Sequence, residues 1–137
     1  MTSSPSIMLI GVPVANKKAV MQGGKEPPAE LIAMVRSQLE ALPDQMRAVG
    51  VDYQVFYVAP DEADGLTRLR DALKEKSFDG VVIGNGVRSN MPLTGWMEQI
   101  IDVVREGAPN AKLMFNTTPA TTVDAVRRWF PIPTSTT

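Results

Sequence analysis

Polar and glycine residues gather in one short stretch, residues 84–90, which reads Gly-Asn-Gly-Val-Arg-Ser-Asn. Glycines let backbone approach a ligand closely and adopt positive φ angles, and consecutive amides in such a turn can bind an anion. The arginine adds a permanent charge whose planar fork matches carboxylate or phosphate. The stretch predicts a site for a small anionic or polar metabolite. Its candidate ligand-binding residues are Gly84, Asn85, Gly86, Arg88, Ser89 and Asn90. In the structural alternative the glycines only make a tight turn, Arg88 pairs with a surface acid, and Asn90 caps the next helix.

Two other segments carry residues suited to the same ligand. Asn116, Thr117 and Thr118 follow an apolar run, and their amide and hydroxyl groups suit either a polar ligand or a helix cap. The segment from residue 13 to 28 is long for a connection after a strand, and loops of that length are often binding loops or lids. We expect Asn16 to contact the ligand there, and Lys17, Lys18 and Lys25 to form a lid over the anion. Ordinary surface lysines are the alternative.

The residue types that the chain lacks restrict its chemistry. It contains no cysteine and no histidine. Within this chain, therefore, there can be no disulfide, thiolate nucleophile, cysteine-ligated zinc, Ser-His-Asp triad or histidine base. We predict no metal and no cofactor, and no residue stands out as a catalytic base. Lyase, isomerase or hydrolase chemistry that needs only polarisation remains compatible. Asp61 and Glu62 are candidate acids, although capping of the second helix explains them better.

The charge pattern excludes two classes of partner. The net charge is −1, and the 14 basic residues are scattered along the chain. Nucleic-acid and anionic-membrane surfaces need clustered Lys and Arg, so neither partner is expected. No apolar run approaches the roughly 20 residues of a membrane span, and no basic residue precedes the first apolar run, as a secretory signal would require. These features predict a cytoplasmic protein.

Four short apolar runs bounded by Gly, Pro, Asn or Asp predict buried strands of a parallel sheet. These runs are Ile7–Val14, Tyr53–Ala59, Gly80–Ile83 and Lys112–Phe115.

Helical patterns lie between and after these runs. The first is a stripe at steps of three or four residues, made of Leu31, Val35, Leu39, Leu42, Met46 and Val49. It keeps its phase through Pro43, which predicts one helix with a kink, or two abutting helices, ending at Gly50. Further helices are predicted around Leu66–Lys76 and Leu93–Gly107, and from Thr121, with a capping box to Asp124, through Phe130.

The alternation of strands and helices predicts an α/β fold in one domain, residues 7–133, with a flexible stretch at 1–6 and a disordered tail at 134–137. Right-handed crossovers make this a small doubly wound, four-stranded parallel sheet in the order 2-1-3-4, with helices on both faces. The layout resembles flavodoxin-like and Rossmann-like single domains, and Asp79–Arg88 is similar to a segment of short α/β proteins. The resemblance implies a ligand site at the carboxyl ends of the strands, between strands 1 and 3.

Known nucleotide motifs match poorly. Gly84-x-Gly86-x-x-Ser89 imitates a dinucleotide fingerprint, but it follows the third strand, and the next helix is expected only near Pro92 or Thr94. A nucleotide-cofactor-binding protein is therefore the second alternative. The first alternative is a non-catalytic module for metabolite sensing or self-association, through the first helix and the Trp129–Phe130 end. The two exposed edges expected of a short sheet predict a homodimer.

Overall fold

In the computed structural model of this chain the described residues are 4–12, 28–88 and 93–132. The predicted tail at 134–137 lies outside them. Within the described residues, no helix combines the length and the apolar character needed to cross a membrane.

The sheet has the predicted topology. Its strands are β1 (Ser6–Gly11), β2 (Asp52–Tyr57), β3 (Gly80–Ile83) and β4 (Lys112–Phe115). They pair in the order β2-β1-β3-β4, and every pair is parallel. Strands β3 and β4 have the predicted bounds, whereas β1 and β2 end earlier than expected, at Gly11 and Tyr57. The residues just after these two strands are nevertheless buried: Val12, Val58 and Ala59. The apolar runs there therefore indicated burial, which continues beyond the last paired residue of each strand.

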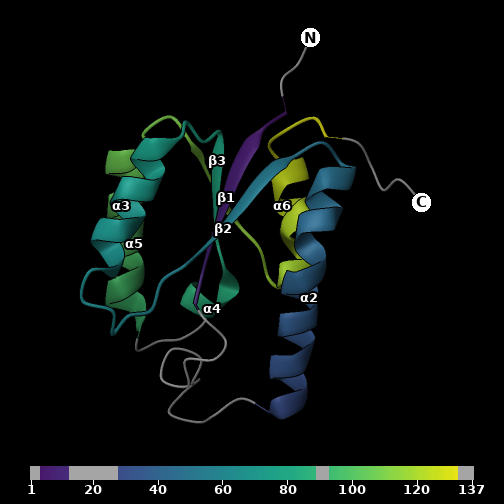
Figure 1. Cartoon of the computed structure of the whole chain (residues 1–137), viewed down its shortest axis with the longest axis horizontal. Coiled ribbons are helices and arrows are strands. Elements are labelled where there is room, and N and C mark those ends of the chain that lie inside the picture. The colour runs from purple at the N-terminus through teal and green to yellow at the C-terminus, as the bar shows by residue number, and fades with distance from the viewer. Residues whose placement is uncertain (1–3, 13–27, 89–92, 133–137) are drawn as a thin grey trace.

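Helices cover both faces of the sheet (Figure 1). The helices α3 (Gly65–Glu75) and α5 (Thr94–Gly107) lie on one face, and α2 (Ala29–Ala48) and α6 (Thr122–Arg127) lie on the other. Two short elements were not predicted: the helical turn α4 (Asn85–Arg88) and the 3-10 turn η2 (Pro119–Thr121).

The expected capping box from Thr121 to Asp124 is wrong, because Thr121 makes no side-chain cap to α6. Asp124 instead pairs with Arg127, at 3.0 Å. The capping box that does form joins Thr118 to Thr121 and closes η2.

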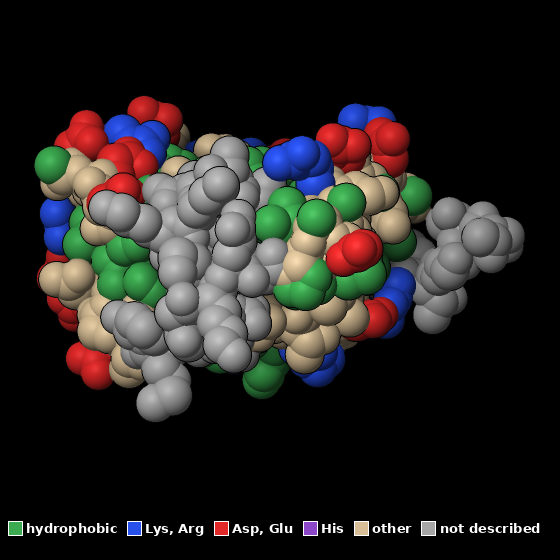
Figure 2. Space-filling view, turned by 90° about the horizontal axis from the view of Figure 1, so that it is seen from below, with side chains coloured by type: hydrophobic (Ala, Val, Ile, Leu, Met, Phe, Trp, Pro, Cys, Tyr) green, Lys and Arg blue, Asp and Glu red, His purple; other side chains and the backbone are tan. Residues whose placement is uncertain are grey.

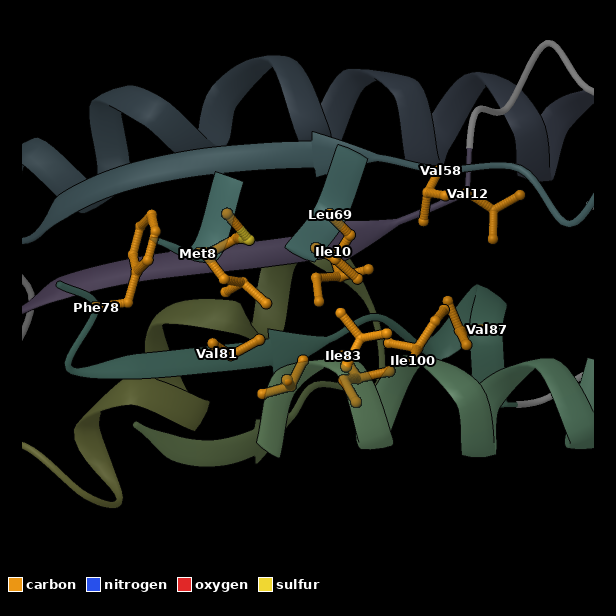
Figure 3. Packing of buried hydrophobic residues seen from close by; sticks show 13 residues of the cluster. Met8, Ile10, Val12, Val58, Leu69, Phe78, Val81, Ile83, Val87 and Ile100 are labelled. Atoms are coloured by element: carbon orange, nitrogen blue, oxygen red, sulfur yellow. The ribbon is translucent and has the colours of Figure 1, made fainter. Parts of the chain in front are cut away.

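Alternate residues of the strands point into two separate cores, as the pleat of a strand requires. On the α3/α5 face, Met8, Ile10, Val81 and Ile83 pack with Leu69 and Ile100 (Figure 3). On the α2/α6 face, Ile7, Leu9, Val82 and Met114 pack with Leu42, Met46 and Val126. Both faces of the two central strands are therefore buried, which explains their uninterrupted apolar sequences.

Helix α2 runs unbroken through Pro43, which confirms one helix rather than two. It ends in a Schellman motif: Val51 N–H donates to the Met46 carbonyl (2.9 Å) and Gly50 N–H to the Arg47 carbonyl (3.1 Å). Gly50 has a φ of 76°, the left-handed conformation that favours glycine at this position. The stripe is buried only in its second half, because the first half extends beyond the sheet (Figure 1).

Each edge strand is protected at its carboxyl end by an arginine from the following segment. The Arg68 guanidinium donates to the Tyr57 carbonyl of β2 (3.4 Å), and the Arg128 guanidinium to the Phe115 carbonyl of β4 (2.7 Å). Covering outward carbonyls with charged side chains reduces the tendency of a sheet edge to pair with another chain.

Two glycines of α5 should respond oppositely to alanine. A Cβ on Gly107 would lie 3.1 Å from Leu73 Cβ, where α3 and α5 pack closely, whereas a Cβ on Gly95 would meet nothing within 4 Å. We expect Gly107→Ala to lower the free energy of unfolding by about 1 kcal/mol or more through overpacking. Gly95→Ala should raise it by about 0.5–1 kcal/mol through helix propensity. Urea denaturation of both variants measures this, and equal shifts would contradict the close packing.

Candidate functional site

The carboxyl ends of all strands meet at one edge of the sheet, because every strand pair is parallel. The strand order reverses there between β1 and β3, since the chain passes from β1 to β2 on one side and then to β3 on the other. At this reversal the loops leave in opposite directions and a crevice can form. The Gly84 amide donates to the Ile10 carbonyl (2.9 Å), so the loop after β3 starts directly beside the end of β1.

A row of residues crosses this edge on the α2/α6 face. Gly11 pairs with Tyr57 in the register of β1 and β2, and continuing the registers of the other two strand pairs by one residue places Gly84 beside Gly11 and Asn116 beside Gly84. The order across the sheet is therefore Tyr57, Gly11, Gly84, Asn116, which we call the glycine row. Its two central members carry no side chain. Gly84 is buried and Gly11 is half-buried, and the absence of side chains lets other groups pack closely on the backbone of the two central strands.

Asn116 is the polar end of the glycine row, and it joins three segments. It is 4 % exposed. Its Oδ1 accepts from the Asn85 amide (3.1 Å), and its Nδ2 donates to Oγ1 of the fully buried Thr122 (2.8 Å). The side chain thus ties the loop after β3 to the start of α6. Asn116 thus orients the candidate site by linking residues that are far apart in the sequence. This role does not depend on contact between Asn116 and a ligand.

The amides of the Gly84–Gly86 turn are partly used by the protein itself. Gly84 N–H continues the β3 ladder, and Asn85 N–H donates to Asn116. Val87 N–H closes the turn onto the Gly84 carbonyl (3.1 Å). The sequence predicted consecutive free amides that face an anion. Fewer amides are available than predicted, because an amide that already has a strong acceptor stabilises a ligand less.

Thr117 and Thr118, both predicted to bind ligand, take part in a local hydrogen-bond cluster. Thr121 Oγ1 accepts from the backbone amides of Thr117 (3.0 Å) and Thr118 (3.1 Å) and donates to the Thr118 carbonyl (2.9 Å). Thr118 also caps η2 through its own side chain. These contacts match the capping alternative for this segment. They hold the loop after β4 against the start of α6.

The other predicted site residues are placed as follows. Gly86 and Arg88 lie in α4, at the same edge as the glycine row. Outside the described residues lie Asn16, Lys17, Lys18, Lys25, Ser89 and Asn90. The structure thus brings together Gly84, Asn85 and Asn116 from the predicted set.

Tyr57 is a site residue that the sequence analysis did not identify. It is the last residue of β2, and its side chain is half-exposed. A Cβ built on Gly11 would lie 3.6 Å from two atoms of the Tyr57 ring, so the ring leans from β2 over the neighbouring strand. Burial raises the pKa of the Tyr57 hydroxyl, which therefore stays protonated at neutral pH and serves as a neutral hydrogen-bond donor. The sequence analysis placed Tyr57 inside the predicted strand Tyr53–Ala59, and only the observed end of β2 puts it at the edge of the sheet.

The acidic residue Glu62, a candidate acid after β2, is engaged in structure. Its Oε2 accepts from Arg68 Nε (2.5 Å), and its Oε1 accepts from the Ala59 amide (3.4 Å). Arg68 in turn lies over the Phe56 ring, 5.1 Å from the centroid. The Glu62–Arg68 pair thus shapes the β2–α3 connection, but Glu62 does not cap α3, which has no side-chain cap at its N-terminus.

A hollow of roughly 300 Å³ lies at the opposite edge of the sheet, where α3 and α5 end. Leu73, Lys74, Lys76, Phe78 and Asn110 are among its lining residues. Lys76 is already paired with Asp52 and lies over the Phe78 ring. Because two helix C-termini carry partial negative charge there, this hollow is less suited to an anion than the carboxyl edge.

Figure 2 views the molecule from the carboxyl edge. Hydrophobic side chains lie on both sides of the area drawn in grey, and most charged side chains lie toward the rims. In the part of the chain that the structure describes, no three acidic side chains lie together as metal ligands would.

Compared with known proteins, the chain matches no family model and no curated relative.

The Asn116 bridge is testable by a double-mutant cycle. We expect Asn116→Ala to lower the free energy of unfolding by about 1–3 kcal/mol, because it leaves the Asn85 amide and the buried Thr122 hydroxyl without their partner. Thr122→Val should cost less, since it removes one hydrogen bond and retains the shape. The double variant should be less destabilised than the sum of the single variants, by about 0.5 kcal/mol or more in urea denaturation. Additive effects would show that the two side chains are not coupled.

Proposed function

We propose that this protein binds a small anionic metabolite, bearing a carboxylate or phosphate, at the carboxyl ends of β1 and β3. The observation that carries the proposal is the pair of adjacent glycines, Gly11 and Gly84, at the point where the strand order reverses. Open parallel sheets bind ligands at this point. Side chains at this position would keep a ligand away from the strand ends, and the residue at this position is a glycine on both central strands.

Close packing supports the presence of glycine at position 84. A Cβ there would lie 3.1 Å from the Ile10 carbonyl oxygen, which belongs to a rigid strand. For Gly11, in contrast, the neighbour among the described residues is the Tyr57 ring, at an ordinary contact distance of 3.6 Å. Packing therefore explains Gly84, while the described neighbours of position 11 leave room for an alanine. Gly11 is the member of the pair that a ligand explains better than packing does.

The preference for an anion comes from the residue types that follow β3. Arg88 is the last residue of α4, which begins directly after the strand, so its backbone lies at the carboxyl edge. Guanidinium groups bind carboxylate and phosphate through two parallel hydrogen bonds. The opposite edge offers an anion less, because the helices α3 and α5 end there.

The proposal is one of binding, without a catalytic step. Glu62, a titratable group at this edge, is paired with Arg68, and Tyr57 is protonated at neutral pH, with its pKa raised further by burial.

Self-association is the competing function. The guanidinium groups of Arg68 and Arg128 on the outward carbonyls oppose edge-to-edge strand pairing. Partial exposure of Phe115 and Trp129 near β4 favours association through side chains, which size-exclusion chromatography tests directly.

A thermal-shift screen with phosphorylated and carboxylated metabolites tests the anion site. A ligand at about 100 times its dissociation constant adds roughly 2.7 kcal/mol of stability to the folded protein. We expect a ligand that stabilises the wild type to lose affinity at least about tenfold in Arg88→Ala, because a charge-assisted hydrogen bond contributes roughly 1.5–3 kcal/mol.

Arg105→Ala is the matched control, since Arg105 is exposed near the end of α5, at the opposite edge of the sheet. It should leave the thermal shift unchanged. Absence of any shift with a folded wild type, or equal losses in the two arginine variants, would contradict an anion site after β3.

A further inference from the structure

We infer that the ligand also carries a planar ring, which stacks on Tyr57 at the apolar end of the glycine row. This inference rests on the proposed function and names its ligand class more closely: an anion joined to a heteroaromatic ring, as in a mononucleotide. The juxtaposition that carries it is a half-exposed aromatic ring that leans over the glycine at the end of the neighbouring strand. Every residue that the inference uses is among those described.

The Tyr57 ring is placed by the backbone on both sides of it. The Tyr57 carbonyl accepts from Arg68, and the next amide, Val58 N–H, donates to the Gly11 carbonyl (3.0 Å). The ring leans over Gly11 on the α2/α6 face, and the residue remains 39 % exposed. A large aromatic side chain held in place at a sheet edge, with much of its surface accessible, can contact a planar ligand at low entropic cost.

The remaining members of the row favour a ligand that is longer than a simple anion. Tyr57 and Asn116 stand on the two outer strands, three strand spacings apart, which is about 14 Å at roughly 4.8 Å per spacing. Gly11 and Gly84 leave the two strands between them without side chains. A ring at the Tyr57 end and a charged group on the β3 side would use the whole row. A small anion alone would leave the aromatic end unused.

The Tyr57 hydroxyl adds a hydrogen-bond donor to the ring. A tyrosine hydroxyl is protonated at neutral pH, and burial raises the pKa of Tyr57 further, so the hydroxyl remains a donor across the neutral range. It does not compete with the anion for a cationic partner. The ring and the hydroxyl thus have separable roles: the ring stacks and the hydroxyl donates. Phenylalanine would retain the first role and remove the second, whereas leucine would remove both.

Isothermal titration calorimetry with adenosine 5′-monophosphate and ribose 5-phosphate tests the inference, since these probes share a phosphate and differ in the planar base. We expect the wild type to bind the nucleotide roughly tenfold more tightly, because stacking of a base on an aromatic side chain contributes about 1–3 kcal/mol. Tyr57→Leu should abolish this preference, and Tyr57→Phe should retain most of it. Trp129→Leu, which removes an exposed aromatic residue near β4, is the control and should retain the preference fully. Thermal unfolding of each variant verifies that it is folded.

Equal affinities for the two probes in the wild type would overturn the ring inference and leave the anion site intact. A preference that survives in Tyr57→Leu would also overturn it, because the ring would then bind elsewhere. If the wild type does not bind the nucleotide, the ring inference is overturned, even if anions without a ring do bind. The fate of the anion site is decided separately, by the metabolite screen on Arg88→Ala.

Discussion

The first strand of this protein is paired on both sides, and the positions of all other elements follow from that pairing. Strand β1 bonds to β2 on one side and to β3 on the other, always in parallel. Parallel neighbours cannot be joined by a tight turn, so each connection must cross a face of the sheet and bring a helix with it. The second crossover must lie on the opposite face from the first. The result is a sheet covered on both faces, with all carboxyl ends at one edge.

The same pairing explains the site. The apolar residues of β1 and β3 fill both cores, and the residue after Ile10 and the residue after Ile83 are both glycines. On the α2/α6 face, the two central strands therefore change from packed side chains to glycine in one step of the sheet. On the flanking strands the same row carries a tyrosine and a buried asparagine. In the proposed function, stability and binding would fall to successive rows of one sheet, and the ligand would rest on its two central strands.

The elements that hold the edge in shape are polar and local. Asn116 joins the β3 loop to Thr122, the threonine cluster closes η2, and Glu62 pairs with Arg68 after β2. Each of these groups was a candidate for ligand binding or acid catalysis by residue type alone. A buried amide that makes hydrogen bonds at both ends is costly to redirect toward a ligand. Asn116 therefore contributes to the proposed site chiefly by positioning it.

The sequence alone determined the elements and their order. Buried strands such as Gly80–Ile83 and Lys112–Phe115 have continuous apolar runs with sharp polar boundaries, and the stripe of α2 keeps its phase through Pro43, because burial selects residue types at the period of each element. Local patterns also indicated the carboxyl edge and Gly84. Only the tertiary structure decided the partners across that edge. Tyr57 lies beside Gly11 through strand register, and Asn116 reaches Asn85 across 31 residues. No local pattern encodes such pairs, because they arise only when crossovers of different lengths bring separate strand ends together.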